Sequence, residues 1–410
     1  MRRVLYILGL MVYLLSSGAW ANPWKVDSIS ERACKDGDAL SCFDAGASAE
    51  RKEDYKRALE FYKIGCNLNN GKNCNEAGVL LGLGKFGEER KKDAVEYYEK
   101  ACSLGNGLGC KNLGFFYERG IGVDKNGSKT AELYKKSCEL NSSSGCKDYG
   151  WLFEVGKFVK KDPKKAVELY RKSCDLGNGI GCKNLGFMYE TGLGTKKDYK
   201  KAIESYKSAC ALGDAQGCKN LGWMYQQGMG VEKNMLIASK LYDRACGGDF
   251  SDGCLNLGVL YEKGYGVKQD KSIAFKLYER ACALGSSIGC NNLGLMYDRG
   301  DGIKQDRVMA VKLYQKSCDM GSAIGCHNLG LSYDNGEGVK QDKKIALKLY
   351  QKSCQKDYAS GCLRLGVIYY FGRTGKKDYP KALKAFEKSC NLGYKKGCKY
   401  YNILKEEMGD

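Results

Sequence analysis

Twenty-two cysteines are arranged in pairs at a fixed interval along the chain. Each pair has seven residues between its members, and from Cys66 onward equivalent cysteines recur every 36 residues. Such a period is typical of a stack of equivalent supersecondary units rather than of a globular domain. The sequence therefore predicts a repeat architecture with one cysteine pair in each unit.

The spacing within a pair predicts a disulfide across a turn. On one continuous helix, residues eight apart would lie about 12 Å apart along the axis, whereas a disulfide holds its Cα atoms about 5.5 Å apart. The chain must therefore reverse between the two cysteines, so that the first ends one helix and the second opens the next. The predicted disulfides are Cys34 with Cys42, Cys66 with Cys74, Cys102 with Cys110, Cys138 with Cys146, Cys174 with Cys182, Cys210 with Cys218, Cys246 with Cys254, Cys282 with Cys290, Cys318 with Cys326, Cys354 with Cys362, and Cys390 with Cys398.

The residues of the turn support this reading. The third residue after every first cysteine is a glycine, asparagine or aspartate, and these residues tolerate the left-handed conformation that closes a helix. We therefore predict a left-handed residue at Gly37, Asn69, Gly105, Asn141, Gly177, Gly213, Asp249, Gly285, Gly321, Asp357 and Gly393.

Each unit contains two helices, which we call the opening helix, beginning at a second cysteine, and the returning helix, ending at the next first cysteine. Leu113, Gly114 and Tyr117 form one apolar face of an opening helix. A glycine occupies the position of Gly114 in all ten full units, although glycine weakens a helix by about 1 kcal/mol. This predicts that a neighbouring helix approaches closely there. Tyr or Phe occupies the fourth position before each first cysteine of these units.

The predicted fold is an all-α solenoid of helix-pair repeats with one disulfide per repeat. Its expected parts are an N-terminal capping helix within residues 22–41, ten repeats of about 36 residues within 42–397, and a C-terminal capping helix within 398–410. A Gly-x-Gly break, such as Gly120 and Gly122, ends the opening helix in six units. The unit that begins at Cys146 lacks this break, so its loop is expected to differ.

The first 21 residues are typical of a secretory signal peptide. Two arginines precede the apolar run of residues 4–15, and small residues follow as far as Ala21. The run is too short for a membrane span, which takes about 20 apolar residues. We expect cleavage after Ala21, export to an oxidising periplasm or medium, where the cysteines can pair, and no transmembrane segment in the mature chain. The formal net charge of +19 favours acidic partners, and export argues against nucleic acid.

The repeated motif resembles that of known helical repeats. Leu-Gly-x-x-Tyr followed by Ala-x-x-x-Tyr is similar to the tetratricopeptide pattern, and the longer period with its Gly-x-Gly loop resembles the Sel1-like repeat. With one disulfide per unit and an export signal, the chain resembles the Helicobacter-type cysteine-rich Sel1-like proteins. Members of that family are described as penicillin-binding proteins and β-lactamases. The resemblance therefore implies a β-lactam-binding protein with weak β-lactam hydrolase activity as an alternative function.

The residues themselves offer little catalytic machinery. A serine β-lactamase uses Ser-x-x-Lys together with motifs such as Lys-Thr-Gly and Ser-Asp-Asn, and neither of the latter two motifs occurs. The two Ser-x-x-Lys matches, Ser144 to Lys147 and Ser353 to Lys356, each contain a cysteine of a disulfide turn. His327 is the only histidine, so a zinc hydrolase site is not expected. We assign no catalytic residue, metal or cofactor.

A series of asparagines marks the expected binding face. Two residues after the second cysteine, six units have an asparagine: Asn112, Asn184, Asn220, Asn256, Asn292 and Asn328. This position lies about 140° from the core face of the helix, and an amide can hydrogen-bond an extended peptide backbone. The alternative is that these residues cap the helix starts, where Asn is favoured. The sequence thus predicts a monomeric scaffold that binds a peptide, a protein or a cell-wall fragment on its concave face, with a β-lactam as the ligand that the family resemblance implies instead.

Overall fold

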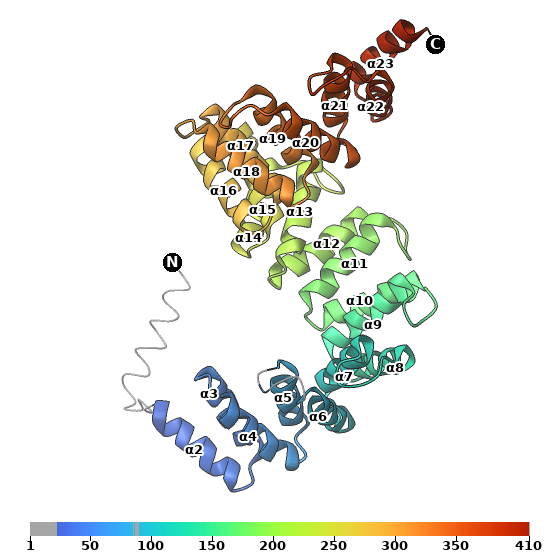
Figure 1. Cartoon of the computed structure of the whole chain (residues 1–410). Coiled ribbons are helices and arrows are strands. Elements are labelled where there is room, and N and C mark those ends of the chain that lie inside the picture. Colours follow the sequence, from blue (N-terminus) through green and yellow to red (C-terminus); the bar gives the residue numbers. More distant parts are fainter. Residues whose placement is uncertain (1–22, 85, 87–89, 410) are drawn as a thin grey trace. The chain divides into compact units, whose positions relative to one another are not determined.

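The computed structural model describes residues 23–84, 86 and 90–409, and in this part of the chain it has 22 α-helices and no strand (Figure 1). The predicted all-α solenoid with one disulfide per repeat is confirmed. None of the described helices is both long and apolar enough to cross a bilayer. The signal-peptide prediction for residues 1–21 lies outside the described residues.

The helices divide between two compact units, residues 1–198 and 199–410. The first contains α2 (Pro23–Lys35), α3 (Ala39–Arg51), α4 (Tyr55–Asn67), α5 (Gly71–Gly82), α6 (Lys91–Ser103), α7 (Gly107–Arg119), α8 (Gly127–Glu139), α9 (Ser143–Val155), α10 (Pro163–Asp175) and α11 (Gly179–Thr191). The second contains α12 (Tyr199–Ala211), α13 (Ala215–Gln227), α14 (Met235–Gly247), α15 (Ser251–Lys263), α16 (Lys271–Ala283), α17 (Ser287–Arg299), α18 (Arg307–Asp319), α19 (Ala323–Asn335), α20 (Lys343–Gln355), α21 (Ala359–Phe371), α22 (Tyr379–Asn391) and α23 (Lys395–Met408). Odd-numbered helices from α3 onward are opening helices, and even-numbered helices are returning helices.

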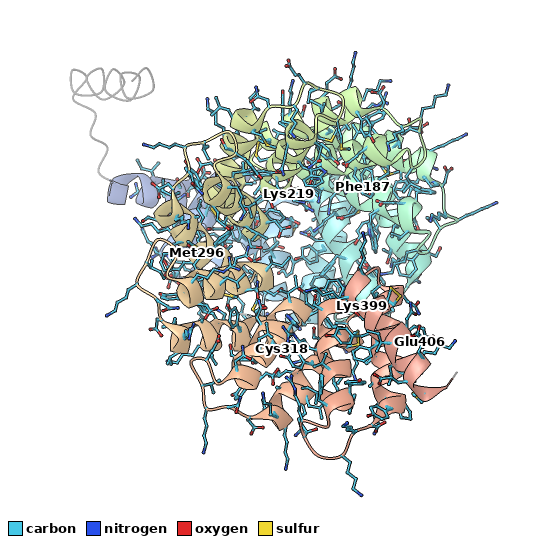
Figure 2. The ribbon with its side chains drawn as sticks, turned by 90° about the horizontal axis from the view of Figure 1, so that it is seen from above. Phe187, Lys219, Met296, Cys318, Lys399 and Glu406 are labelled. Atoms are coloured by element: carbon cyan, nitrogen blue, oxygen red, sulfur yellow. A yellow bond between two sulfur atoms is a disulfide. The ribbon has the colours of Figure 1, made fainter. Side chains whose placement is uncertain are left out.

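All 22 cysteines form disulfides in the eleven pairs named above, and none is free. The paired Cα atoms lie between 4.3 and 4.6 Å apart. Every disulfide joins the end of one helix to the first turn of the next, as at the labelled Cys318 in Figure 2. The predicted left-handed residue has a positive φ in all eleven turns, for example +79° at Gly105 and +57° at Asn141.

The opening helices begin three residues before the second cysteine, earlier than expected. α7 starts at Gly107, and its cap residue Asn106 accepts a hydrogen bond from the backbone N–H of Gly109 at 2.7 Å. Asn70 and Ser142 hold the same position in other turns and also cap their helices with the side chain. Side-chain capping satisfies N–H groups that have no partner within the helix, and this explains the earlier start.

The glycine inside each opening helix lies against the aromatic ring of the following returning helix. A Cβ atom built on Gly258 would lie 2.7 Å from the ring of Tyr278, and one built on Gly114 would lie 2.8 Å from the ring of Tyr134. Both tyrosines are almost fully buried. The close approach predicted from the sequence is therefore present, and it explains why a residue unfavourable to helices recurs in every unit.

The loop of the unit at Cys146 has a phenylalanine where the six Gly-x-Gly loops have their second glycine, and a glycine lies at the position that this residue contacts. In other units the second loop glycine, such as Gly122, packs against the backbone at the start of the returning helix 31 residues earlier. Phe158 takes this place with φ +63°, and the residue 31 positions before it is Gly127, which leaves room for the ring. The left-handed backbone is thus kept at Phe158. The small residue of the contacting pair is Gly127 here, whereas in the Gly-x-Gly units it is the loop glycine.

Candidate functional site

Two cavities lie at equivalent positions between successive opening helices, one in each compact unit. The first, which we call the aromatic cavity, has a volume of about 400 Å³ and lies among α7, α9 and α11. The second, the aliphatic cavity, has a volume of about 300 Å³ and lies between α15 and α17. Volumes of this order can hold a small ligand or a few residues of a peptide.

The floor of each cavity is built from three polar positions of the repeat. In the aromatic cavity, Tyr134 donates a hydrogen bond to Glu118 at 2.8 Å, and in the aliphatic cavity Tyr278 donates to Glu262 at 2.6 Å. Burial, reinforced by the carboxylate, raises the pKa of both tyrosines far above the ordinary value. These hydroxyls therefore stay neutral donors across the physiological pH range.

An asparagine predicted from the sequence lines each cavity, but the two are not equivalent: Asn292 lies in the opening helix directly after Tyr278, where the aromatic cavity has Asp148, and Asn184 comes from the following repeat. Asn184 lines the aromatic cavity, and Asn292 lines the aliphatic one. Asn292 also hydrogen-bonds the hydroxyl of Tyr278, and Asn184 hydrogen-bonds that of Tyr170. Their amides thus lie at the junction between consecutive repeats and border the space that a ligand would occupy.

The other four predicted asparagines lie at the same helix position and are all partly buried. Asn112 donates to Asn75 at 2.9 Å, and Asn328 donates to Asn291 at 2.7 Å, so these two amides link neighbouring repeats. Asn220 lies on α13 and Asn256 on α15. The capping role considered as an alternative is taken by other residues, such as Asn106 and Asn178, four positions before the second cysteine.

The walls of the cavities come from a position that the sequence reasoning missed. Five residues after the second cysteine, Phe115 and Trp151 border the aromatic cavity, and each remains 37% exposed. The aliphatic cavity has Val259 and Leu295 at this position. Phe187 continues the series on α11 (Figure 2). Aligning the repeats would have shown this run of exposed aromatic residues, because they lie outside the predicted core positions.

Cations surround the aromatic cavity. Lys111, Arg119, Lys147 and Lys183 line it together with the carboxylates Glu118 and Asp148. Lys147 pairs with Asp148 at 2.5 Å, and Lys157, just outside, reaches Glu118 at 2.8 Å. Burial would raise the pKa of Glu118, but hydrogen bonds from Lys157 and Tyr134 hold it below its ordinary value. Glu118 is therefore a carboxylate whose charge is already compensated.

The two Ser-x-x-Lys matches do not form nucleophile–base pairs in the described structure. Ser353 is fully buried and donates to the backbone oxygen of Ala323 at 2.8 Å, a bond that Ser137 makes with Gly107 in another repeat. Ser144 lies 3.2 Å from the hydroxyl of the cap residue Ser142. No hydrogen bond joins either serine to its lysine, Lys147 or Lys356. Both motifs therefore belong to the turns and junctions of the repeats.

His327, the only histidine, lies on α19 with 8% of its surface exposed. Its ring packs against those of Tyr350 and Tyr358, with centroids 5.7 and 5.2 Å away. Burial, with a smaller contribution from the Arg364 charge, lowers its pKa to about 4. Within the described ranges no three His, Cys, Asp or Glu side chains gather as a metal-binding group.

The low pKa of His327 predicts that the protein loses stability in acid. Between the unfolded pKa of 6.5 and the folded value of about 4, the unfolded chain binds the proton and the folded one does not, so stability falls as the pH falls. The full difference is on the order of 3 kcal/mol. His327→Leu, which places there the residue found at the equivalent Leu255 and Leu363, is expected to lose less thermal stability between pH 7 and pH 4.5. Melting followed by circular dichroism checks this, and an equal loss in both proteins would contradict it.

Comparison with known proteins agrees with the repeat pattern. The Sel1 repeat family profile matches residues 33–70, 74–106, 108–142, 143–178, 180–214, 215–249, 251–286, 287–322, 323–358 and 359–394. The expected resemblance to Sel1-like repeats is confirmed. A comparison with curated protein sequences finds no match.

Several solved structures are similar to this chain. One is c5321 of uropathogenic Escherichia coli, described as a protective antigen; it is 25% identical, with a TM-score of 0.68, over 92% of this chain and 82% of its own. A Sel1 repeat protein from Oxalobacter formigenes is 21% identical, with a TM-score of 0.59, over 75% of this chain and 89% of its own. Cysteine-rich protein B of Helicobacter pylori is 37% identical, with a TM-score of 0.28, over 33% of this chain and 97% of its own.

Proposed function

The chain belongs to the Sel1 repeat family, and from this premise we propose that it is an extracytoplasmic scaffold that holds an extended peptide segment of a partner protein along its opening helices. Solenoids of stacked helix pairs bind partners along such extended surfaces. The eleven disulfides support a location in an oxidising compartment. A framework fixed by disulfides loses little conformational entropy when it binds, which favours affinity.

One observation carries this proposal: the same cavity is built twice from equivalent repeat positions. Each has a tyrosine–carboxylate floor and an apolar wall, and the polar residue 14 positions after the tyrosine is Asp148 in one cavity and Asn292 in the other. An amide offers two donors and one acceptor, the groups that an extended backbone requires at regular intervals. Each cavity is bordered by successive opening helices, so an extended segment can follow it from one repeat to the next.

The β-lactam alternative receives no support from the serine motifs. Ser353 is buried, and its hydroxyl is used in the junction between repeats. Nucleophilic catalysis requires a serine that substrate can reach and a base within hydrogen-bond distance. We therefore place peptide binding ahead of β-lactam hydrolysis.

Loss of the two cavity asparagines is expected to weaken peptide binding. Peptides would first be selected from a phage-displayed random dodecapeptide library on the full oxidised chain and then measured by fluorescence anisotropy. The double change Asn184→Ala and Asn292→Ala is expected to raise Kd by roughly two- to tenfold, because a peptide in either cavity loses one hydrogen bond, which is worth about 0.5–1.5 kcal/mol.

The control for this experiment is Asn391→Ala, which removes an exposed amide at the end of α22, away from both cavities. It should bind the selected peptides as the unchanged chain does, and circular dichroism should show equal helicity in all proteins. Failure to select any peptide, or equal affinity of the double variant, would contradict the proposed function.

A further inference from the structure

The two cavities share a floor but differ in charge. Cations and carboxylates balance in the aliphatic cavity, where Lys263 and Arg299 face Glu262 and Asp301. In the aromatic cavity four cations, Lys111, Arg119, Lys147 and Lys183, accompany only two carboxylates, Glu118 and Asp148. The aromatic cavity therefore has an excess of positive charge that the aliphatic cavity lacks.

The carboxylates of the aromatic cavity already have partners within the protein. Lys157 and Tyr134 bind Glu118, and Lys147 binds Asp148. Lys111 contacts the neutral amide oxygen of Asn112 at 3.3 Å, and its ammonium lies 5.8 Å from the ring centroid of Phe115. The Arg119 guanidinium lies 5.7 Å from the same centroid. Positive potential thus remains at the mouth of the cavity after the internal pairs are formed. Complementary charge of this kind steers and selects a partner.

Aromatic rings lie directly beneath these cations. Phe115 and Trp151 are both 37% exposed, and the ammonium of Lys157 lies 5.2 Å from the Trp151 ring. Partly exposed aromatic side chains beside arginine or lysine are typical of the residues that dominate binding energy in protein interfaces. The cavity therefore combines an apolar contact surface with a positive rim.

We propose, resting on the scaffold function above, that the aromatic cavity selects an acidic peptide segment in which carboxylates alternate with apolar side chains. An aromatic or aliphatic side chain inserts between Phe115 and Trp151, the flanking carboxylates meet Lys111 and Arg119, and the amide of Asn184 hydrogen-bonds the backbone. The aliphatic cavity, with no excess charge, does not share this preference.

The shape of the site favours a peptide over a membrane. The cations and rings lie in a hollow bounded by three helices, which a narrow chain can enter and a flat bilayer cannot. Burying a charged ligand also requires hydrogen-bonding partners for its polar backbone, and Asn184 provides one at the floor.

The test uses three fluorescein-labelled peptides and the full oxidised chain. Their central sequences are Asp-Phe-Asp-Phe-Asp, Asn-Phe-Asn-Phe-Asn and Asp-Ala-Asp-Ala-Asp, and anisotropy gives Kd at low and at physiological salt. The first peptide is expected to bind at least roughly tenfold tighter than the other two, and its affinity should fall as salt rises, because exposed charges are screened.

Variants then locate the binding. The double change Lys111→Glu and Arg119→Glu is expected to weaken binding of the acidic aromatic peptide by roughly tenfold or more, because attraction becomes repulsion. Trp151→Ala should weaken it as well. The matched control Lys164→Glu reverses an exposed charge at the start of α10 and should leave binding unchanged. Circular dichroism and melting temperature verify that each variant is folded.

The outcomes separate this inference from the proposed function. The inference would be overturned, and the scaffold function would remain, if the library-selected peptides are not enriched in acidic residues and bind the charge-reversal variant with unchanged affinity. Absence of any peptide binding would overturn both. The inference would also be overturned if the peptides do not bind, while anionic phospholipid vesicles or alginate, an anionic polysaccharide, bind in a way that requires Lys111 and Arg119.

Discussion

Reduction of the eleven disulfides is expected to unfold the protein at about 37 °C, whereas the oxidised chain should keep its helicity well above that temperature. Each disulfide closes a loop of about nine residues and contributes on the order of 2.5 kcal/mol in the chain-entropy model. Typical domains are stable by only about 5–15 kcal/mol in total. Even if the eleven terms add only in part, their loss exceeds that margin.

The packing between repeats explains why so much depends on the crosslinks. The junctions use small residues, such as Ala101, Ala209 and Ala281, all fully buried. Small side chains bury little apolar surface, and burial contributes only about 25 cal/mol per Å². A repeat stack also lacks contacts between distant parts of the sequence that could compensate for a weakened turn.

The measurement is helicity against temperature, by circular dichroism, with and without dithiothreitol kept in the sample. Free thiols counted by mass spectrometry establish that reduction is complete. As a local control, the pair Cys246→Ala and Cys254→Ala should retain most helicity and gain a protease-sensitive site near the turn between α14 and α15. A fully reduced chain that melts at the same temperature as the oxidised one would refute the prediction.

The features that could be predicted from the sequence are those set within one turn or one helix. The separation of eight between Cys102 and Cys110 excludes a single helix, and Gly105 between them meets the requirement for a left-handed residue. Both arguments depend only on backbone geometry over a few residues. Because the same local pattern recurs through the chain, a correct prediction for one turn applies to all eleven disulfide turns.

The features that could not be predicted depend on contacts between residues about 30 to 37 positions apart. Examples are the exchange of small partners between Phe158 and Gly127 and the bond from Asn112 to Asn75. The sequence analysis placed Tyr117 in the core, whereas the structure buries Phe116 and leaves Tyr117 only partly covered. Which of two adjacent apolar residues is buried depends on how the next helix packs. The spacing of apolar residues along one helix does not give the position of that neighbouring helix.

The aromatic wall of the candidate site, formed by Phe115 and Trp151, was not predicted for a related reason. Phe115 and Trp151 each follow the glycine of the predicted apolar face and lie outside that face, so the pattern within one helix assigned them no role. The space beside Gly114 and Gly150 is filled by Tyr134 and Tyr170 of the next returning helices, and the neighbouring Phe115 and Trp151 remain partly exposed.

Gly258→Val is expected to destabilise the second compact unit by about 3 kcal/mol, because overpacking a filled core costs 1–3 kcal/mol and sometimes more. A Cβ at this position would lie 2.7 Å from a ring carbon of Tyr278, and the two further carbons of valine would crowd the ring more. Tyr278 is fully buried and bound to Glu262 at 2.6 Å, so it cannot move aside without breaking that bond. Urea denaturation followed by circular dichroism measures the loss.

The matched control is Gly247→Val, in the last turn of α14, where a Cβ meets no atom within 4 Å. Valine and glycine differ there mainly in helix propensity, which changes stability by less than about 1 kcal/mol. Combining Gly258→Val with Tyr278→Leu should recover part of the stability, because a smaller side chain frees space beside residue 258. If the two valine variants unfold at the same urea concentration, close packing at Gly258 is not what stabilises the junction between α15 and α16.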